Sequence, residues 1–79
     1  MHINKVMQSL ETDDGTRCVD IFQRPDGSYG FEEYRRDVED PRGWAPVGGY
    51  GEERYPDQDA TLTRAIAMVA WLALVLAKI

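Results

Sequence analysis

The chain has 79 residues, of which 43% are hydrophobic and 29% are charged, a composition typical of one small globular domain and not of a disordered chain. A chain this short buries only about 60% of the surface that its unfolded form exposes, so its core is thin and self-association would add burial. The net charge is -5 at pH 7, and this acidic balance argues against nucleic-acid binding, which needs a basic surface.

Cysteine content and the first residues indicate where the protein works. Cys18 is the only cysteine, which excludes an internal disulfide and a thiolate metal cluster and fits a reducing, cytoplasmic setting. The start, "MHINKVMQSLETDD", holds no apolar run long enough for the core of a signal peptide. We therefore expect a cytoplasmic protein.

Residues 1–17 carry a weak helical pattern. Ile3, Val6, Met7 and Leu10 follow the i, i+3, i+4, i+7 spacing of one helix face. Only one or two turns could form, and helices this short are marginal in water. We expect residues 1–17 to be an N-terminal arm that is either frayed or docked as a short helix.

The stretch "CVDIFQRPDGSYGFEEYRR" predicts a β-hairpin over residues 18–36. Two runs of β-branched and aromatic residues flank Pro25, Asp26 and Gly27. Proline presets the first turn dihedral and glycine accepts a positive φ, so these residues predict a type I turn closed by a glycine bulge.

That turn also predicts the register of the two strands. The expected cross-strand pairs are Gln23 with Tyr29, Ile21 with Phe31, and Val19 with Glu33. The apolar face would then consist of Val19, Ile21, Tyr29 and Phe31. On the other face Phe22 would cover Gly30, and Cys18 would be an inert, half-buried thiol because no histidine is placed to activate it.

A loop and a third strand are expected after the hairpin. Residues 37–43 combine acidic residues with proline and glycine, which is typical of a loop. The segment from Trp44 to Gly48 could pair next, at an edge of the sheet, because Pro46 lacks an amide proton for a central ladder.

The C-terminal segment predicts one long helix. Asp57 can cap its start, and neither glycine nor proline interrupts the chain from there to Lys78. Residues 65–77 are thirteen consecutive apolar residues, fewer than the roughly twenty that a bilayer requires. We therefore expect no membrane span.

This helix would be apolar on two faces. A step of 100° per residue places one set toward the sheet: Leu62, Ile66, Val69, Leu72, Ala73 and Leu76. The opposite set comprises Ala67, Trp71, Leu74 and Val75. Because a three-stranded sheet covers only one face, we expect the second to contact another protein chain, as in a homodimer anchored by Trp71. The alternative is that the apolar stripe of residues 3–10 folds over it.

Residues suited to catalysis or metal binding are scarce. His2 is the only histidine, and Glu32 and Glu33 are neighbours in a strand, so their carboxylates should point to opposite faces. The acidic run "DVED" lacks the spaced oxygen ligands of a calcium loop, and "GGYG" lacks the Lys-Ser/Thr of a phosphate loop. We predict no catalytic, cofactor-binding or metal-binding residue and do not expect an enzyme.

Arginine is the one basic feature that could gather locally. Arg35, Arg36, Arg42 and Arg54 could meet near the end of the sheet. Their acidic neighbours, Glu32, Glu33, Asp37, Glu39 and Asp40, are expected to cancel most of the resulting field.

The segments "VDIFQRPDGSYGFEEYRRD", "GWAPVGGY", "RYPD" and "AWL" resemble a group of short bacterial proteins without an established activity. The resemblance covers roughly residues 19–72 and implies a unit of hairpin, edge strand and helix, with no catalytic residue to transfer. If the first stripe is helical, the order of elements also resembles the double-stranded-RNA-binding fold. That fold requires lysines at the helix start, where this chain has Asp57, Gln58 and Asp59.

These observations predict an α+β fold in which a three-stranded antiparallel sheet carries a long C-terminal helix on one face. Residues 1–17 would form the arm and residues 18–79 a single β-β-β-α domain. The function expected is a non-catalytic protein-interaction module that self-associates through the C-terminal helix and binds no nucleic acid. The alternative is a domain that binds a small ligand or nucleic acid.

Overall fold

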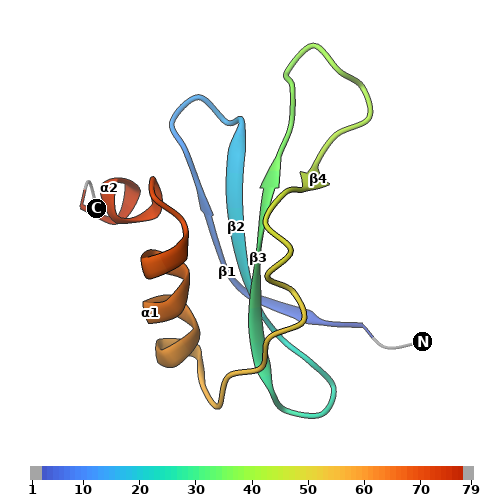
Figure 1. The fold of residues 1–79 in the computed structure, drawn as a ribbon. Coiled ribbons are helices and arrows are strands. Elements are labelled where there is room, and N and C mark those ends of the chain that lie inside the picture. The colour runs from blue at the N-terminus through green and yellow to red at the C-terminus, as the bar shows by residue number, and fades with distance from the viewer. Residues whose placement is uncertain (1–2, 78–79) are drawn as a thin grey trace.

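The computed structural model describes residues 3–77 and shows a sheet with helices on one face (Figure 1). The four strands lie in chain order, each antiparallel to its neighbour. They are β1 (Lys5–Glu11), β2 (Arg17–Gln23), β3 (Tyr29–Arg35) and β4 (Ala45–Pro46). Helices α1 (Gln58–Met68) and α2 (Leu72–Leu76) follow. The predicted α+β class is confirmed, with one strand more than expected.

Residues 5–11 form a strand, so the expectation of an N-terminal arm that is either frayed or a short helix is wrong for this segment. Lys5–Glu11 pairs with β2 along its whole length, with Leu10 opposite Val19. A bulge between Val6 and Gln8 inserts an extra residue there, which breaks the alternation that would mark a strand in the sequence. Pairing with β2 satisfies backbone groups that a one- or two-turn helix would leave marginal.

The β2–β3 hairpin confirms the predicted register. Gln23, Ile21 and Val19 lie opposite Tyr29, Phe31 and Glu33, and Phe22 lies opposite Gly30. At the turn, the Gly27 amide donates to the Arg24 carbonyl at 2.9 Å, and Gly27 has a φ of 90°. Only glycine adopts that conformation without strain, so the turn depends on it.

The chain after β3 runs back along the β3 edge. Pro46 pairs with Tyr34 in β4, which confirms the expected edge strand, and Tyr55 forms a bridge with Tyr29 further along. Between these two points the Glu32 carboxylate accepts hydrogen bonds from the backbone amides of residues 50 and 51 at 3.3 and 3.0 Å. Arg24 donates to the carbonyls of residues 51 and 53. Side chains thus hold this segment where no ladder forms.

The C-terminal segment is two helices, so the expected continuous helix is wrong. Asp57 caps α1 as predicted, since its carboxylate accepts the Ala60 amide at 2.7 Å. After Met68 the backbone of Val69 becomes extended, with a φ of -107° and a ψ of 104°. The break changes the direction of the chain and places α2 against β1, whereas α1 packs mainly on β2 and β3 (Figure 1). The predicted helix end at Lys78 lies outside the described residues.

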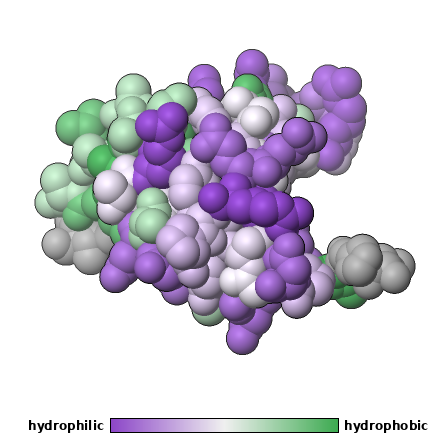
Figure 2. All heavy atoms as spheres, turned by 60° about the horizontal axis from the view of Figure 1, so that its bottom comes forward, coloured by the Kyte–Doolittle hydropathy of each residue, from purple (hydrophilic) through white to green (hydrophobic). Residues whose placement is uncertain are grey.

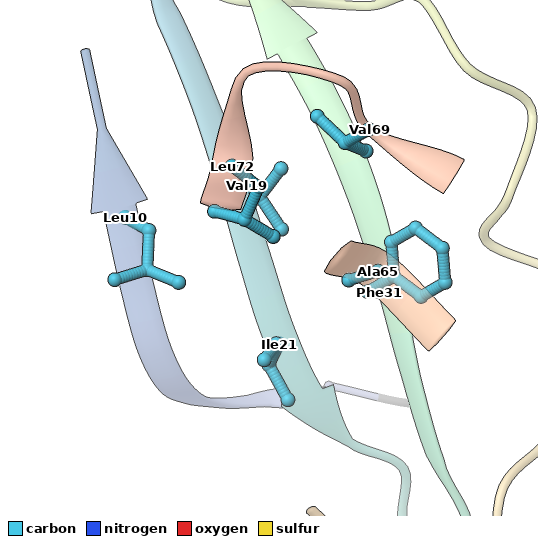
Figure 3. Close-up of a cluster of buried hydrophobic side chains, with 7 residues drawn as sticks. All are labelled: Leu10, Val19, Ile21, Phe31, Ala65, Val69 and Leu72. Carbon is cyan, nitrogen blue, oxygen red and sulfur yellow. The ribbon is translucent and has the colours of Figure 1, made fainter. Parts of the chain in front are cut away.

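The core lies between the sheet and the helices. Its buried side chains come from three strands, from α1, and from the break and α2: Leu10, Val19, Ile21, Phe31, Ala65, Val69 and Leu72 (Figure 3). Ala65 and Thr61 are fully buried on the inner side of α1, and their small side chains allow the helix to approach the sheet closely. The Thr61 hydroxyl is satisfied because it donates to the Asp57 carbonyl at 2.7 Å.

Candidate functional site

The outer side of the C-terminal helices exposes an apolar surface. Leu74 is 68% exposed, Met68 is 42% exposed and Ile66 is 36% exposed. Exposed alanines lie between these three in the sequence, at positions 67, 70 and 73. Figure 2 shows hydrophobic surface gathered on this side of the molecule. We call Ile66, Ala67, Met68, Ala70, Ala73 and Leu74 the apolar helical surface.

The apolar helical surface is uncharged. No charged residue occurs from Ala65 to Ala77, whereas the whole chain has a net charge of -5. Arg64, exposed in α1, lies just before this segment in sequence. Two copies of this acidic protein could therefore meet here without opposing like charges across the contact.

The structure separates the four residues predicted to form the interface. Ala67 and Leu74 are exposed and belong to the apolar helical surface, whereas Val75 is half-buried. Trp71 turns toward the sheet, packs against the core, and donates from Nε1 to the Glu33 carboxylate at 2.9 Å. Trp71 is therefore not available as an outward anchor in this structure.

Ile66 and Met68 are the exposed residues that sequence reasoning did not assign to the interface. Ile66 was expected to face the sheet, but Thr61 and Ala65 take that side of α1. An i, i+4 spacing of small residues is the signal that could have found this, because small side chains permit close packing of a helix on a sheet.

The sheet face away from the helices holds the one thiol. Cys18 is buried, and its Sγ lies 3.3 Å from the Ser9 hydroxyl and 3.2 Å from the Asp20 carboxylate. Ser9 donates to Asp20 at 2.7 Å. Burial raises the pKa of Cys18 to about 11, and the negative charges of Asp20 and Glu11 add to the shift. A thiol held protonated in this way is a poor nucleophile, as expected.

The acidic residues and the glycine segment serve internal contacts. Glu32 and Glu33 point to opposite faces as predicted, because the Glu32 carboxylate accepts hydrogen bonds from the backbone amides of residues 50 and 51, while the Glu33 carboxylate accepts one from the Trp71 indole. Two amides of the "GGYG" segment, those of Tyr50 and Gly51, are thus directed at a carboxylate of the chain itself. Within residues 3–77, no three His, Cys, Asp or Glu side chains are grouped closely enough to hold a metal ion. His2 lies outside the described residues.

Neither helix in the described part of the chain combines the length and apolar character needed to cross a bilayer. No family model matches the chain, and no curated protein or solved structure matches it.

Proposed function

We propose that this chain is a non-catalytic protein-interaction module and that its partner is a second copy of itself. The observation that carries the proposal is the exposure of Leu74, at 68%, within the apolar helical surface. Exposed apolar patches of this kind mark association sites in soluble proteins. Because the partly buried Trp71 turns toward the sheet, Ile66 and Met68 take its place in this proposal as the larger contact residues.

A second copy suits the surface for two reasons. The surface is uncharged in a chain of net charge -5, so it is a region where two identical acidic chains can approach each other with little repulsion. Its alanines are small enough for two helices to pack closely across a two-fold axis, where the same patch contacts itself. Burial of Leu74 and Met68 would add to a core that is thin in a chain of this length.

Two features of the described residues favour binding over catalysis. The raised pKa of Cys18 keeps the thiol protonated near neutral pH. The two adjacent glutamates diverge to opposite sheet faces and are engaged by Trp71 and by loop amides. These groups are occupied in maintaining the fold.

Sedimentation equilibrium at micromolar concentration tests the proposal. The wild type should be a dimer, and Leu74→Asp should be a monomer with an unchanged circular dichroism spectrum, because a carboxylate cannot be buried without a partner. Val38→Asp is the matched control, since Val38 is 69% exposed and lies in the loop after β3. It should remain a dimer. A wild type that is monomeric throughout the micromolar range would contradict the proposal.

A further inference from the structure

Arginines converge at one end of the sheet. Arg17 and Arg35 lie directly opposite each other, at the start of β2 and the end of β3. Like charges in such a cross-strand pair repel. Arg17 has the Glu33 carboxylate at 3.7 Å, but among residues 3–77 the Arg35 side chain forms no hydrogen bond or ion pair. The exposed Arg35 guanidinium therefore has no ion-pair partner in the described part of the chain.

Two more arginines line a hollow beside this pair. The Arg36 guanidinium lies 4.6 Å from the ring centroid of Trp44, and its Nε donates to the Gly15 carbonyl at 2.8 Å. The Arg42 guanidinium forms an ion pair with the Asp40 carboxylate, with Nη2 2.6 Å from Oδ2. The hollow that contains Arg35, Arg36, Arg42 and Trp44 has a volume of about 510 Å³. A second hollow of about 240 Å³ adjoins it through Arg35 and Arg36 and reaches Arg17.

The charge of this region is opposite to that of the rest of the chain. Four arginines and the two aspartates at positions 37 and 40 line the two hollows and give a formal charge of +2. The remaining residues then carry -7, since the total is -5. The cancellation expected from the sequence is incomplete, because of the five acidic neighbours only Asp37 and Asp40 line the hollows, and Glu33, 3.7 Å from Arg17, is the counter-charge of that arginine alone. Arg54 lies elsewhere, paired with Asp26 near the hairpin turn.

We propose that this end of the sheet binds a compact small molecule that carries two or more phosphate groups. The residues that would hold it are Arg17, Arg35, Arg36 and Arg42, with Trp44 as an apolar wall. Guanidinium groups bind phosphate oxygens in pairs, and an anion between Arg17 and Arg35 would relieve their repulsion. The larger hollow has the volume of a small-ligand site.

The ligand must be compact because of the surrounding charge. An extended polyanion such as a nucleic acid would reach beyond the +2 region and be repelled by the rest of the chain, whose net charge is -7. A molecule contained within the hollow avoids that repulsion. None of the site residues belongs to the apolar helical surface, so this proposal does not depend on self-association.

Titration with tripolyphosphate, monitored by two-dimensional NMR and by calorimetry, tests the site. The Trp44 indole N–H signal should shift on binding, because Trp44 lines the larger hollow. Arg35→Gln should weaken binding about tenfold or more. Arg54→Gln removes the same charge at a distant ion pair and should leave binding within about twofold of the wild type.

Three outcomes would overturn the proposal. The first is the absence of saturable tripolyphosphate binding at low salt. The second is an equal loss of affinity in Arg35→Gln and Arg54→Gln, which would indicate general charge attraction. The third is tighter binding of a single-stranded DNA oligonucleotide than of tripolyphosphate. The Leu74→Asp monomer should bind tripolyphosphate as the wild type does, which separates a failure of this site from a failure of self-association.

Discussion

Replacement of Trp71 by phenylalanine isolates the contact that holds the C-terminal segment to the sheet. The change removes the indole N–H and keeps much of the apolar ring. In the structure that N–H donates to the Glu33 carboxylate at 2.9 Å, and the Glu33 side chain is only 12% exposed. Water therefore cannot fully replace the lost donor, and Arg17 at 3.7 Å is the remaining charged neighbour.

The expected loss in the free energy of unfolding is about 2 kcal/mol, because hydrogen bonds to charged groups contribute about 1.5 to 3 kcal/mol. Chains of this length have stabilities of about 4 to 12 kcal/mol, so the change is readily measured. Trp44→Phe is the matched control. Its indole is partly exposed and contacts Arg36 only through its face, so it should lose less than about 1 kcal/mol.

Urea denaturation in the Leu74→Asp background keeps association out of the measurement. A double-mutant cycle with Glu33→Ala, which removes the acceptor, should give a coupling energy of about 1 to 2 kcal/mol between Trp71 and Glu33. A coupling energy below about 0.5 kcal/mol would refute the contact. Trp71 would then be free to face outward, as the sequence alone suggested.

Three further predictions concern the core and two ionisable groups. Leu72→Ala should lower the free energy of unfolding by about 3 kcal/mol because Leu72 is fully buried, whereas Leu74→Ala in the monomer should change it by less than about 0.5 kcal/mol in urea denaturation. Cys18, whose pKa is raised to about 11 from an ordinary 9.0, should react with iodoacetamide at pH 8 about 100-fold more slowly in the native than in the unfolded chain. Stability should fall as the pH rises from about 9 to 11, because the unfolded thiol releases its proton first. Hydrogen bonds from Thr12 and Thr16 lower the pKa of the Asp14 carboxyl to about 2. The contribution of Asp14 to stability should therefore be complete above about pH 4 and be lost as the pH falls toward 2. Thr12→Ala should raise the pKa of Asp14 in an NMR titration.

The central hairpin could be predicted from the sequence because its signals are local. The turn residues from Pro25 to Gly27 determine the pairing, and strict alternation on both sides assigns the faces. Strand β1 could not be predicted because its bulge interrupts that alternation, so Val6, Met7 and Leu10 fit a helical spacing instead. Strand β1 forms by pairing with β2, and no pattern within residues 5–11 indicates that pairing.

The candidate site was predicted in part, for a similar reason. The excess of apolar residues near the C-terminus and the exposure of Leu74 follow from the sequence. The break at Val69 does not, because no glycine or proline marks it and the extended backbone there is compensated by burial of Val69 and Leu72. The assignment of helix faces assumed a rotation of 100° per residue along one continuous helix. That rotation does not continue past the extended Val69, so Trp71 was wrongly assigned to the outer face of the helix.

The segment that Glu32 and Arg24 hold against β3 has a consequence for how the sheet could grow. Its backbone occupies the outer side of β3, so a strand from another molecule finds no continuous row of free amides and carbonyls there. The opposite border, β1, is kinked by its bulge and presents a regular edge only from Gln8 onward. Within residues 3–77, addition of a strand from another molecule is thus blocked at the β3 border and restricted at the β1 border to the short stretch from Gln8 to Glu11. This protects a small sheet against edge-to-edge aggregation.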